Sequence, residues 1–229
     1  MKKEFRYSAV FVLILMFLPA LYAQKSSYNK LYKPLSLIQR LSYENFRSIK
    51  LLQAAIVNYG GGETEMDRLV DQYAEASALY FQNRIEDSAL KFQENEKAIL
   101  AMAKKLAQVY RRDTENIMME NIKLNIKYTM KLALKGDKVN PSADKLLDNG
   151  RSGYQRANDY YDRYINATSA SPRELITAIY YYRRSKENFI LMYDAIDLEK
   201  DKKEELKEKY RKDIDDSKNR IYRAREKQN

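Results

Sequence analysis

Apolar residues recur every three or four positions along most of this chain, which is the spacing of one face of an α-helix. No stretch alternates apolar and polar residues for long enough to predict a β-strand. The spacing therefore predicts a run of helices joined by short turns. The expected helices lie at 34–59, 89–109, 114–136, 142–164 and 171–196. One more helix starts at 64 and is followed by a short connection at 83–86.

Glycine, proline and small polar residues mark the ends of these helices. Gly60 opens a glycine triplet that ends the first helix, and Gly136 ends the fourth, because glycine readily adopts the backbone conformation that terminates helices. The clearest start is at Ser171, where serine accepts from free amides and Pro172 fits the first helical position. Glu174 completes a capping box with Ser171.

Two boundaries are less sharply marked. The charged residues 111–113 predict a break between the third and fourth helices. The fifth helix starts near Ser142 or, because two glycines weaken its first half, near Ser152. Short turns place consecutive helices antiparallel, so the predicted fold is all-α, with helical hairpins forming an elongated bundle or a short tetratricopeptide-like array.

Residues 1–23 differ from the rest of the chain. A basic start precedes an unbroken apolar run at 9–18, and Pro19 and Ala23 follow. This order is typical of a secretory signal peptide cleaved after a small residue. The run is shorter than the roughly 20 apolar residues of a membrane-spanning helix. The leader predicts an exported, periplasmic protein.

The remaining chain divides into two predicted parts. Residues 24–197 carry the helical pattern and form the bundle or repeat domain. Residues 198–229 are densely charged with few apolar positions, and they predict a charged C-terminal helix or tail. A solvated helix, a coiled-coil partner and a frayed tail all fit this second part.

The composition lacks the usual catalytic side chains. There is no cysteine and no histidine, which removes the commonest nucleophile, the commonest general base and most soft-metal ligands. No glycine-rich phosphate loop is present. The adjacent carboxylates 204–205 and 215–216 diverge by about 100° on a helix, so they do not converge on one substrate. The sequence predicts a non-enzymatic protein without cofactor or metal.

The charge points to an anionic partner. The chain has 42 Lys and Arg against 32 Asp and Glu, and removal of the leader leaves 39 against 31, a net charge of +8. An exported protein does not normally meet nucleic acid, so phosphate head groups, cell-wall polymer or an acidic protein surface are the expected partners. Membrane contact is expected only through the signal peptide, and no particular oligomeric state is predicted.

A short segment resembles a repeat hairpin. Small and large residues at 76–92 have spacings similar to those of a tetratricopeptide hairpin, in which small residues let two helices approach. The residues that carry this likeness are Ala76, Leu79, Ile85, Ser88 and Phe92. A looser second copy involves Ala157, Tyr160, Ala178 and Tyr182. A generic antiparallel helix hairpin explains the same residues, so both interpretations stay open.

The leader ends Leu-Tyr-Ala-Gln, cysteine and tryptophan are absent, and residues 160–164 and 180–184 are rich in tyrosine. In this combination the chain resembles exported, all-helical proteins of spirochaetes, and in particular the flagellar coiling proteins. The resemblance is one of general character over the mature chain and rests on no diagnostic motif. It implies a structural role in motility, beside the periplasmic flagellar filament, and it assigns no functional residue.

The tyrosine-rich segments supply the candidate partner-binding residues. Tyr180 lies two positions before Tyr182 on the core stripe, so it should point about 200° away from it. Tyrosine and arginine are enriched at interface hot spots. The candidates are Tyr160, Tyr180, Tyr181, Arg183 and Arg184. The alternative is that most of the tyrosines pack in the core with their hydroxyls reaching solvent. Met118, Met119 and Met130 are predicted to fill the core.

The sequence thus favours an exported structural or interaction protein, with the periplasmic flagellar filament or sheath subunits as the specific expected partners. The alternative is an envelope module that binds an anionic lipid or cell-wall fragment between helices. An enzyme would require a buried carboxylate in a cleft.

Overall fold

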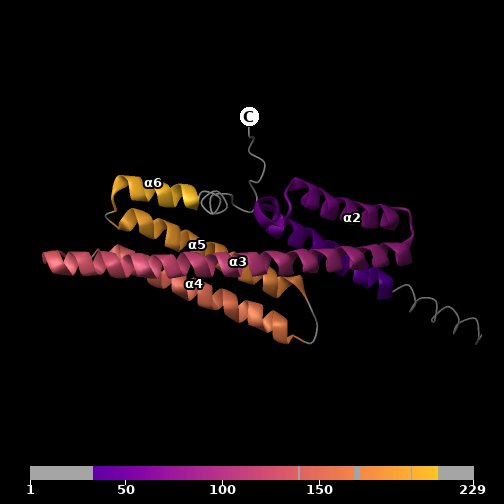
Figure 1. Cartoon of the computed structure of the whole chain (residues 1–229). Helices are drawn as coiled ribbons and strands as arrows, with labels where there is room; N and C mark the ends of the chain where they lie inside the picture. The colour runs from indigo at the N-terminus through magenta and orange to yellow at the C-terminus, as the bar shows by residue number, and fades with distance from the viewer. Residues whose placement is uncertain (1–32, 139, 168–170, 197, 211–229) are drawn as a thin grey trace, which may run out of the picture.

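The computed structural model describes residues 33–138, 140–167, 171–196 and 198–210, and over these it is a set of packed helices (Figure 1). No residue in those ranges lies in a β-strand, so the predicted all-α class is confirmed. In chain order the elements are a first helix at 33–55, the π-helical turn η1 (Ile56–Gly60), α2 (Glu63–Phe81), α3 (Ile85–Lys135), α4 (Pro141–Asn166), α5 (Pro172–Ala195) and α6 (Lys200–Lys209). The tetratricopeptide-like array remains a prediction.

α3 is the spine of the molecule. It has 51 residues, without glycine or proline, and is therefore roughly 75 Å long at 1.5 Å per residue. The first helix and α2 lie along its N-terminal half, α4 and α6 lie along its C-terminal half, and α5 extends from the first helix across the middle of α3 to α6 (Figure 1). The molecule is elongated because this one helix runs from end to end.

The predicted break at residues 111–113 is wrong, because the buried stripe of α3 continues through it. Tyr110, Thr114 and Ile117 are all buried, at helical spacings of four and three. The hydroxyl of Thr114 donates to the carbonyl of Tyr110 at 2.6 Å, four residues earlier in the same continuous helix. Arg112 is exposed, so its charge faces solvent and leaves the helix intact.

Two predicted helix starts are confirmed by their capping bonds. Ser171 Oγ accepts from the amide of Arg173 at 3.2 Å. The donor of this capping bond is one residue before Glu174, the residue named for the capping box. α4 begins at Pro141, and Asn140 Oδ1 accepts from the amide of Ser142 at 3.0 Å. The start near Ser142 is therefore correct, and the alternative start near Ser152 is wrong.

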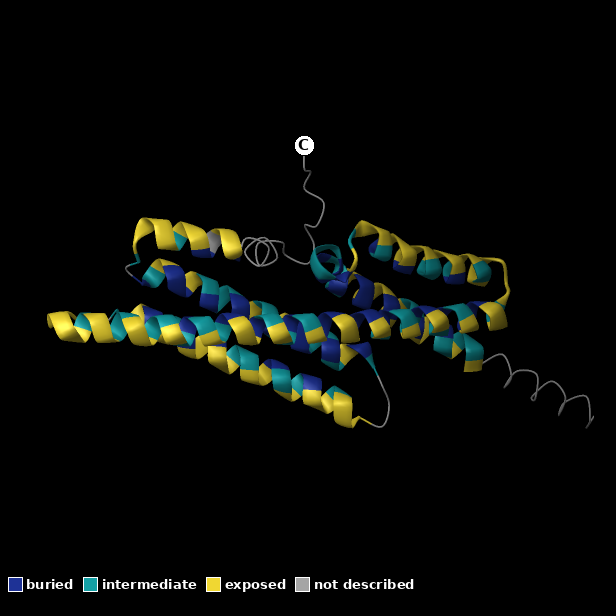
Figure 2. Cartoon of the chain, in the orientation of Figure 1, coloured by how far each residue is buried: buried dark blue, intermediate teal, exposed yellow. Residues whose placement is uncertain are grey.

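The buried side chains form three clusters along α3. The largest lies where the first helix, α2, α3, α4 and α5 meet, and it includes Leu52, Leu106 and Tyr182. A second surrounds Phe189 between α3, α4, α5 and α6. A third joins the first helix, α2 and the start of α3 around Phe92. The apolar stripes inferred from the sequence thus face one another across a shared interior (Figure 2).

Three buried asparagines tie neighbouring helices together. The side-chain amide of Asn45 donates to the carbonyl of Phe92 at 2.9 Å, that of Asn95 to Leu69 at 3.0 Å, and that of Asn121 to Phe189 at 2.6 Å. Each bond joins two different helices. Because a buried polar group without a partner is costly, these bonds favour one alignment of the helices over others.

α4 and α5 are in close contact at Gly150. The hydroxyl of Ser185 donates to the carbonyl of Gly150 at 2.6 Å. A Cβ atom built on Gly150 would lie 2.3 Å from a ring carbon of Phe189, which is closer than real Cβ atoms come to any neighbour. Glycine is thus needed here for helix packing, although it weakens the helix itself.

Gly150→Ala is expected to destabilise the protein by about 1–2 kcal/mol. The clash with Phe189 costs about 1–3 kcal/mol, and the better helix propensity of alanine returns up to about 1 kcal/mol. Gly153→Ala is the matched comparison, because its added Cβ would meet Ser185 Cβ at 3.3 Å and needs only a small adjustment. Urea unfolding of both variants measures the difference, and equal stabilities would contradict the close contact at Gly150.

α6 is held against α3 by a small polar cluster. Lys209 Nζ lies 2.7 Å from Glu120 Oε2, and the hydroxyl of Tyr210 donates to the same oxygen. The ring of Tyr210 stacks on Tyr193 at 6.0 Å, and Leu206 is buried. Burial raises the pKa of Glu120, but the hydrogen bonds from Lys209 and Tyr210 outweigh it and leave that pKa below its usual value. Burial, followed by the bond to Glu120, raises the pKa of Tyr210 to about 12.

These shifts predict a pH window for the docking of α6. The lowered pKa of Glu120 contributes stability above its unfolded value of 4.5, and the contribution is lost as pH falls through the folded value. The raised pKa of Tyr210 contributes below 10.0 and is lost as pH rises toward about 12. The protection of the α6 amides from hydrogen exchange, relative to the intrinsic rate at each pH, should therefore fall at both limits.

Glu120→Gln should lower this protection about tenfold at neutral pH, since the group that accepts from Lys209 and Tyr210 loses its charge. Glu205→Gln is the control, because Glu205 pairs only with Lys202 on the surface of α6 itself. Equal exchange rates in the two variants would contradict the role of Glu120.

Part of the chain lies outside the described residues. This holds for the predicted leader at 1–23 and for residues 211–229, including the carboxylates Asp215 and Asp216. Of the predicted C-terminal part, residues 198–210 are described and contain α6. Among the described helices, none has the length and apolar character that crossing a membrane requires.

Candidate protein-interaction site

A groove runs between the first helix and α5. It consists of two adjoining hollows, of about 190 and 370 Å³, that share Leu51, Ile176 and Thr177 in their walls. We call it the α5 groove. Its other lining residues are Tyr43, Glu44, Asn45, Arg47, Ser48, Glu96, Ser171, Pro172, Arg173, Ile179, Tyr180 and Arg183.

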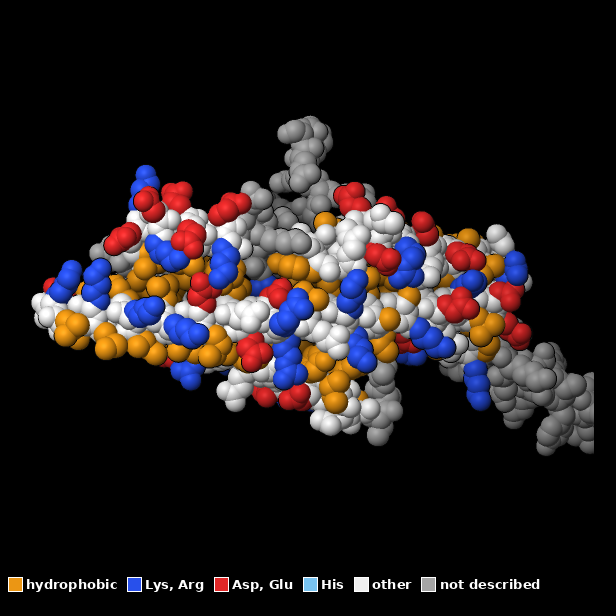
Figure 3. All heavy atoms as spheres, in the orientation of Figure 1, with side chains coloured by type: hydrophobic (Ala, Val, Ile, Leu, Met, Phe, Trp, Pro, Cys, Tyr) orange, Lys and Arg blue, Asp and Glu red, His pale blue; other side chains and the backbone are white. Residues whose placement is uncertain are grey.

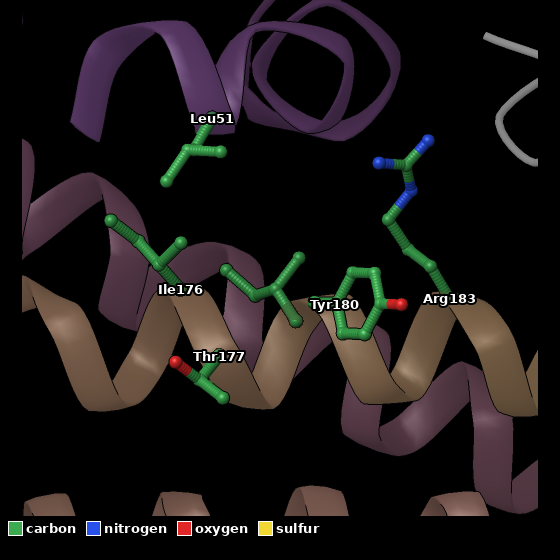
Figure 4. Close-up of a pocket in the computed structure, with 6 residues that line it drawn as sticks. Leu51, Ile176, Thr177, Tyr180 and Arg183 are labelled. Atoms are coloured by element: carbon green, nitrogen blue, oxygen red, sulfur yellow. The ribbon is translucent and has the colours of Figure 1, made fainter. Parts of the chain in front are cut away.

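The floor of the α5 groove is apolar and its margins are polar. Leu51 comes from the first helix and lies across from Ile176 on α5, and Arg183 lies further along α5, beyond Tyr180 (Figure 4). Tyr180 is 48% exposed, so it points away from the core as the helical geometry predicted. An apolar floor with aromatic and charged edges is the usual composition of a protein-binding surface.

Three arginines give the α5 groove its charge. Arg47 lies on the first helix, whereas Arg173 and Arg183 lie on α5. The groove also contains two carboxylates, Glu44 and Glu96. The arginines outnumber the carboxylates, and Glu44 also pairs with Arg40 outside the groove at 2.8 Å. The net charge of the groove is therefore positive and favours anionic groups.

The three candidate tyrosines form a continuous row from α4 to the groove. Tyr160 on α4 stacks on Tyr181 of α5, with ring centroids 5.6 Å apart and planes at 13°. Tyr181 meets Tyr180 edge-on at 5.3 Å. At the other end, the guanidinium of Arg163 lies 4.9 Å from the centroid of Tyr160. Such contacts hold aromatic rings in fixed positions.

The candidate residues are therefore only partly brought together. Tyr180 and Arg183 line the α5 groove, and Tyr160 and Tyr181 support Tyr180 from behind. Arg184 is not among the lining residues, and it pairs with Glu187 on its own helix at 2.5 Å. Of the five candidates, Arg184 has the weakest structural connection to the site.

Glu96 is a groove residue of distinct chemistry. Burial raises the pKa of its carboxyl group; the positive charge of Arg40 partly offsets this rise and the negative charge of Glu44 adds to it. A half-buried carboxyl with a raised pKa is what a general acid requires. Among the described residues, no cluster of three or more His, Cys, Asp or Glu side chains has the arrangement of a metal site. The carboxylates Glu204 and Glu205 are both exposed on α6.

Sequence reasoning missed the half of the site that the first helix supplies. Tyr43 and Arg47 lie outside the apolar stripe of that helix, and nothing local indicated that they would face α5. The available signal was Tyr43, an aromatic residue outside the apolar stripe and therefore exposed. Exposed apolar side chains that lie together indicate an interaction surface.

The prediction that the methionines fill the core is wrong for two of the three. Met119 and Met130 are 49% and 61% exposed, whereas Met118 is half-buried. Met119 and Met130 lie on the outer face of α3, whereas Met118 packs against the cluster around Phe189.

Comparison with known proteins adds no family to these observations. No family model matches the sequence, and neither the curated proteins nor the solved structures contain a match to the chain.

Proposed function

We propose that this chain is an exported, non-enzymatic structural or interaction protein, which binds another periplasmic protein through the α5 groove. The observation that supports this most is the exposed Tyr180 beside Arg183, above the apolar floor of Leu51 and Ile176. The row of stacked tyrosines behind Tyr180 holds it in place before binding, which lowers the entropic cost of forming a complex.

The dimensions of the α5 groove suit a segment of a protein partner. It follows α5 over the 12 residues from Pro172 to Arg183, roughly 16 Å. This is the length of about three helical turns or five extended residues. The three arginines select a segment with acidic side chains, and the apolar floor selects aliphatic or aromatic ones between them.

The specific assembly that we propose is the sheath of the periplasmic flagellar filament. It rests on the resemblance to flagellar coiling proteins, the predicted leader, and the elongated shape set by α3. Deletion of the gene should change filament shape or motility. Cells that swim normally and carry normal filaments would contradict this assignment.

Charge reversal at two neighbouring positions tests the α5 groove directly. Arg183→Glu, which changes a lining residue, should reduce recovery of the partner at least about tenfold in purification of the tagged protein from its own cells. Arg184→Glu is the matched control and should leave recovery near that of the parent chain, since Arg184 does not line the groove. Equal recovery with both variants would contradict the assignment of the groove.

An anionic lipid or cell-wall fragment is the second candidate ligand of the α5 groove. The larger hollow, of about 370 Å³, has Arg47 and Arg173 in its walls, which suits a phosphate or carboxylate group. Native mass spectrometry of gently purified protein would show the added mass of such a ligand. Recovery of the chain at its own mass, together with a co-purified protein, favours the first candidate.

A further inference from the structure

The C-terminal end of α3 carries an apolar row that none of the other described elements covers. Ile126, Met130 and Leu134 are 54%, 61% and 87% exposed. In Figure 3, hydrophobic side chains line one edge of this arm of the molecule, and basic side chains lie beside them. We call the three residues, together with Lys123, Lys127 and Lys131, the α3 stripe.

The geometry of α3 places these six side chains on one side of the helix. At 100° per residue, Ile126, Met130 and Leu134 fall within about 80° of one another. Lys123, Lys127 and Lys131, at spacings of four, follow along one margin of this row. The opposite side of α3 contributes Leu124 and Tyr128 to the cluster around Phe189. Among the described residues, the inner face of α3 therefore packs against its neighbours, and the apolar outer face packs against none.

The charge of this segment has a single sign. Residues 121–135 contain four lysines and no aspartate or glutamate. Within the part of the chain that the structure describes, Lys123, Lys127, Lys131 and Lys135 form no ion pair. Lys123 and Lys127 also line an open hollow of about 500 Å³ beside the stripe. Glu120 lines the same hollow, but its carboxylate accepts a hydrogen bond from Lys209.

We propose that the α3 stripe docks the protein on the surface of an anionic phospholipid bilayer. A helix with an apolar row bordered by lysines lies in the interface, with its apolar side chains among the acyl chains and its ammonium groups at the phosphates. A second copy of this chain fits less well, because two stripes in contact would bring rows of lysines together. This site is separate from the α5 groove, and it adds a membrane contact beyond the leader.

Vesicle binding tests the proposal on residues 24–229, the chain expected after removal of the leader. Co-sedimentation should show stronger binding to vesicles of phosphatidylcholine mixed with phosphatidylglycerol than to phosphatidylcholine alone. Changing Ile126, Met130 and Leu134 together to serine should lower the partition coefficient at least about tenfold. Changing Lys123, Lys127 and Lys131 together to glutamine should lower it about a hundredfold on the anionic vesicles only.

A matched control replaces three exposed apolar residues elsewhere, Phe81, Leu90 and Ile165, by serine. This variant should bind as the parent chain does. All changed side chains are exposed, so thermal unfolding should show that each variant remains folded.

The absence of cysteine allows a direct measurement of insertion. An environment-sensitive fluorophore attached to Met130→Cys should shift to the blue on anionic vesicles, and the same label at Ile165→Cys should not. Equal shifts at both positions, or equal binding by the stripe and control variants, would overturn the proposal. Loss of a co-purified protein from the stripe variants, without any vesicle binding by the parent chain, would also overturn it and assign the stripe to a protein partner.

Arg183→Glu separates this inference from the proposed function. It changes the α5 groove and should leave vesicle binding unchanged. If Arg183→Glu does not change partner recovery, the membrane proposal is unaffected. If the stripe variants do not change vesicle binding, the assignment of the α5 groove is unaffected.

Discussion

Arg112→Pro should destabilise the protein by about 3 kcal/mol or more, which corresponds to a fall in melting temperature of about 6–12 °C. Proline removes the amide hydrogen bond of residue 112, and its ring clashes with the carbonyl four residues earlier. The break would fall in the middle of α3, where Tyr110 and Thr114 belong to the buried stripe on both sides of the position. Helices that pack along both halves of α3 would lose their common support.

Arg112→Ala is the control for the proline variant. Arg112 is exposed and its contact with Asp113, at 3.3 Å, is a surface pair worth little. Its loss should change stability by no more than about 0.5 kcal/mol. Circular dichroism and thermal unfolding of both variants measure the difference. Proline tolerated as well as alanine at this position would show that α3 is not continuous.

Phe189→Ala should cost about 3–5 kcal/mol, because Phe189 is fully buried at the centre of the second cluster. Its ring fills the space that Gly150 leaves open on α4. Removal of the ring creates a cavity between α3, α4, α5 and α6, which the rigid helices close only in part. Leu191→Ala, at an exposed position of the same helix, should stay within about 0.5 kcal/mol of the parent chain.

The Phe189 and Gly150 variants should not be additive. The clash of Gly150→Ala depends on the ring of Phe189, so it disappears in the Phe189→Ala background and the helix propensity of alanine remains. Gly150→Ala should therefore become neutral or slightly stabilising there. A double-mutant cycle from urea unfolding measures this coupling, and additive costs would show that the two residues do not touch.

Most of the helical pattern was predictable from the sequence, and the exception shows why. The spacing of apolar residues located the first helix, α2, α4 and α5, because each buries one face. The charges at 111–113 suggested a break because they were judged locally. The decisive information was at Tyr110 and Ile117, which continue the buried stripe on either side. A helix persists where its buried face is continuous, even if three charges occur together.

The candidate site was predictable only on one side. The exposure of Tyr180 followed from its angle to Tyr182 on the same helix, which requires no tertiary information. The position of Arg47 and Leu51 opposite Ile176 depends on how the first helix packs against α5, and no local pattern specifies that. The same limit explains Met119 and Met130, because the sequence does not show which side of α3 its neighbours cover.

The uninterrupted course of α3 makes the molecule a spacer of fixed length. Glu96 on α3 lines the α5 groove, and Met130 lies 34 residues further along the same helix, about 50 Å away at 1.5 Å per residue. A partner bound in the α5 groove and a lipid surface bound at the α3 stripe would be kept at a constant distance from each other. Insertion of residues into α3 would lengthen that distance and also rotate one contact relative to the other by about 100° for each residue added.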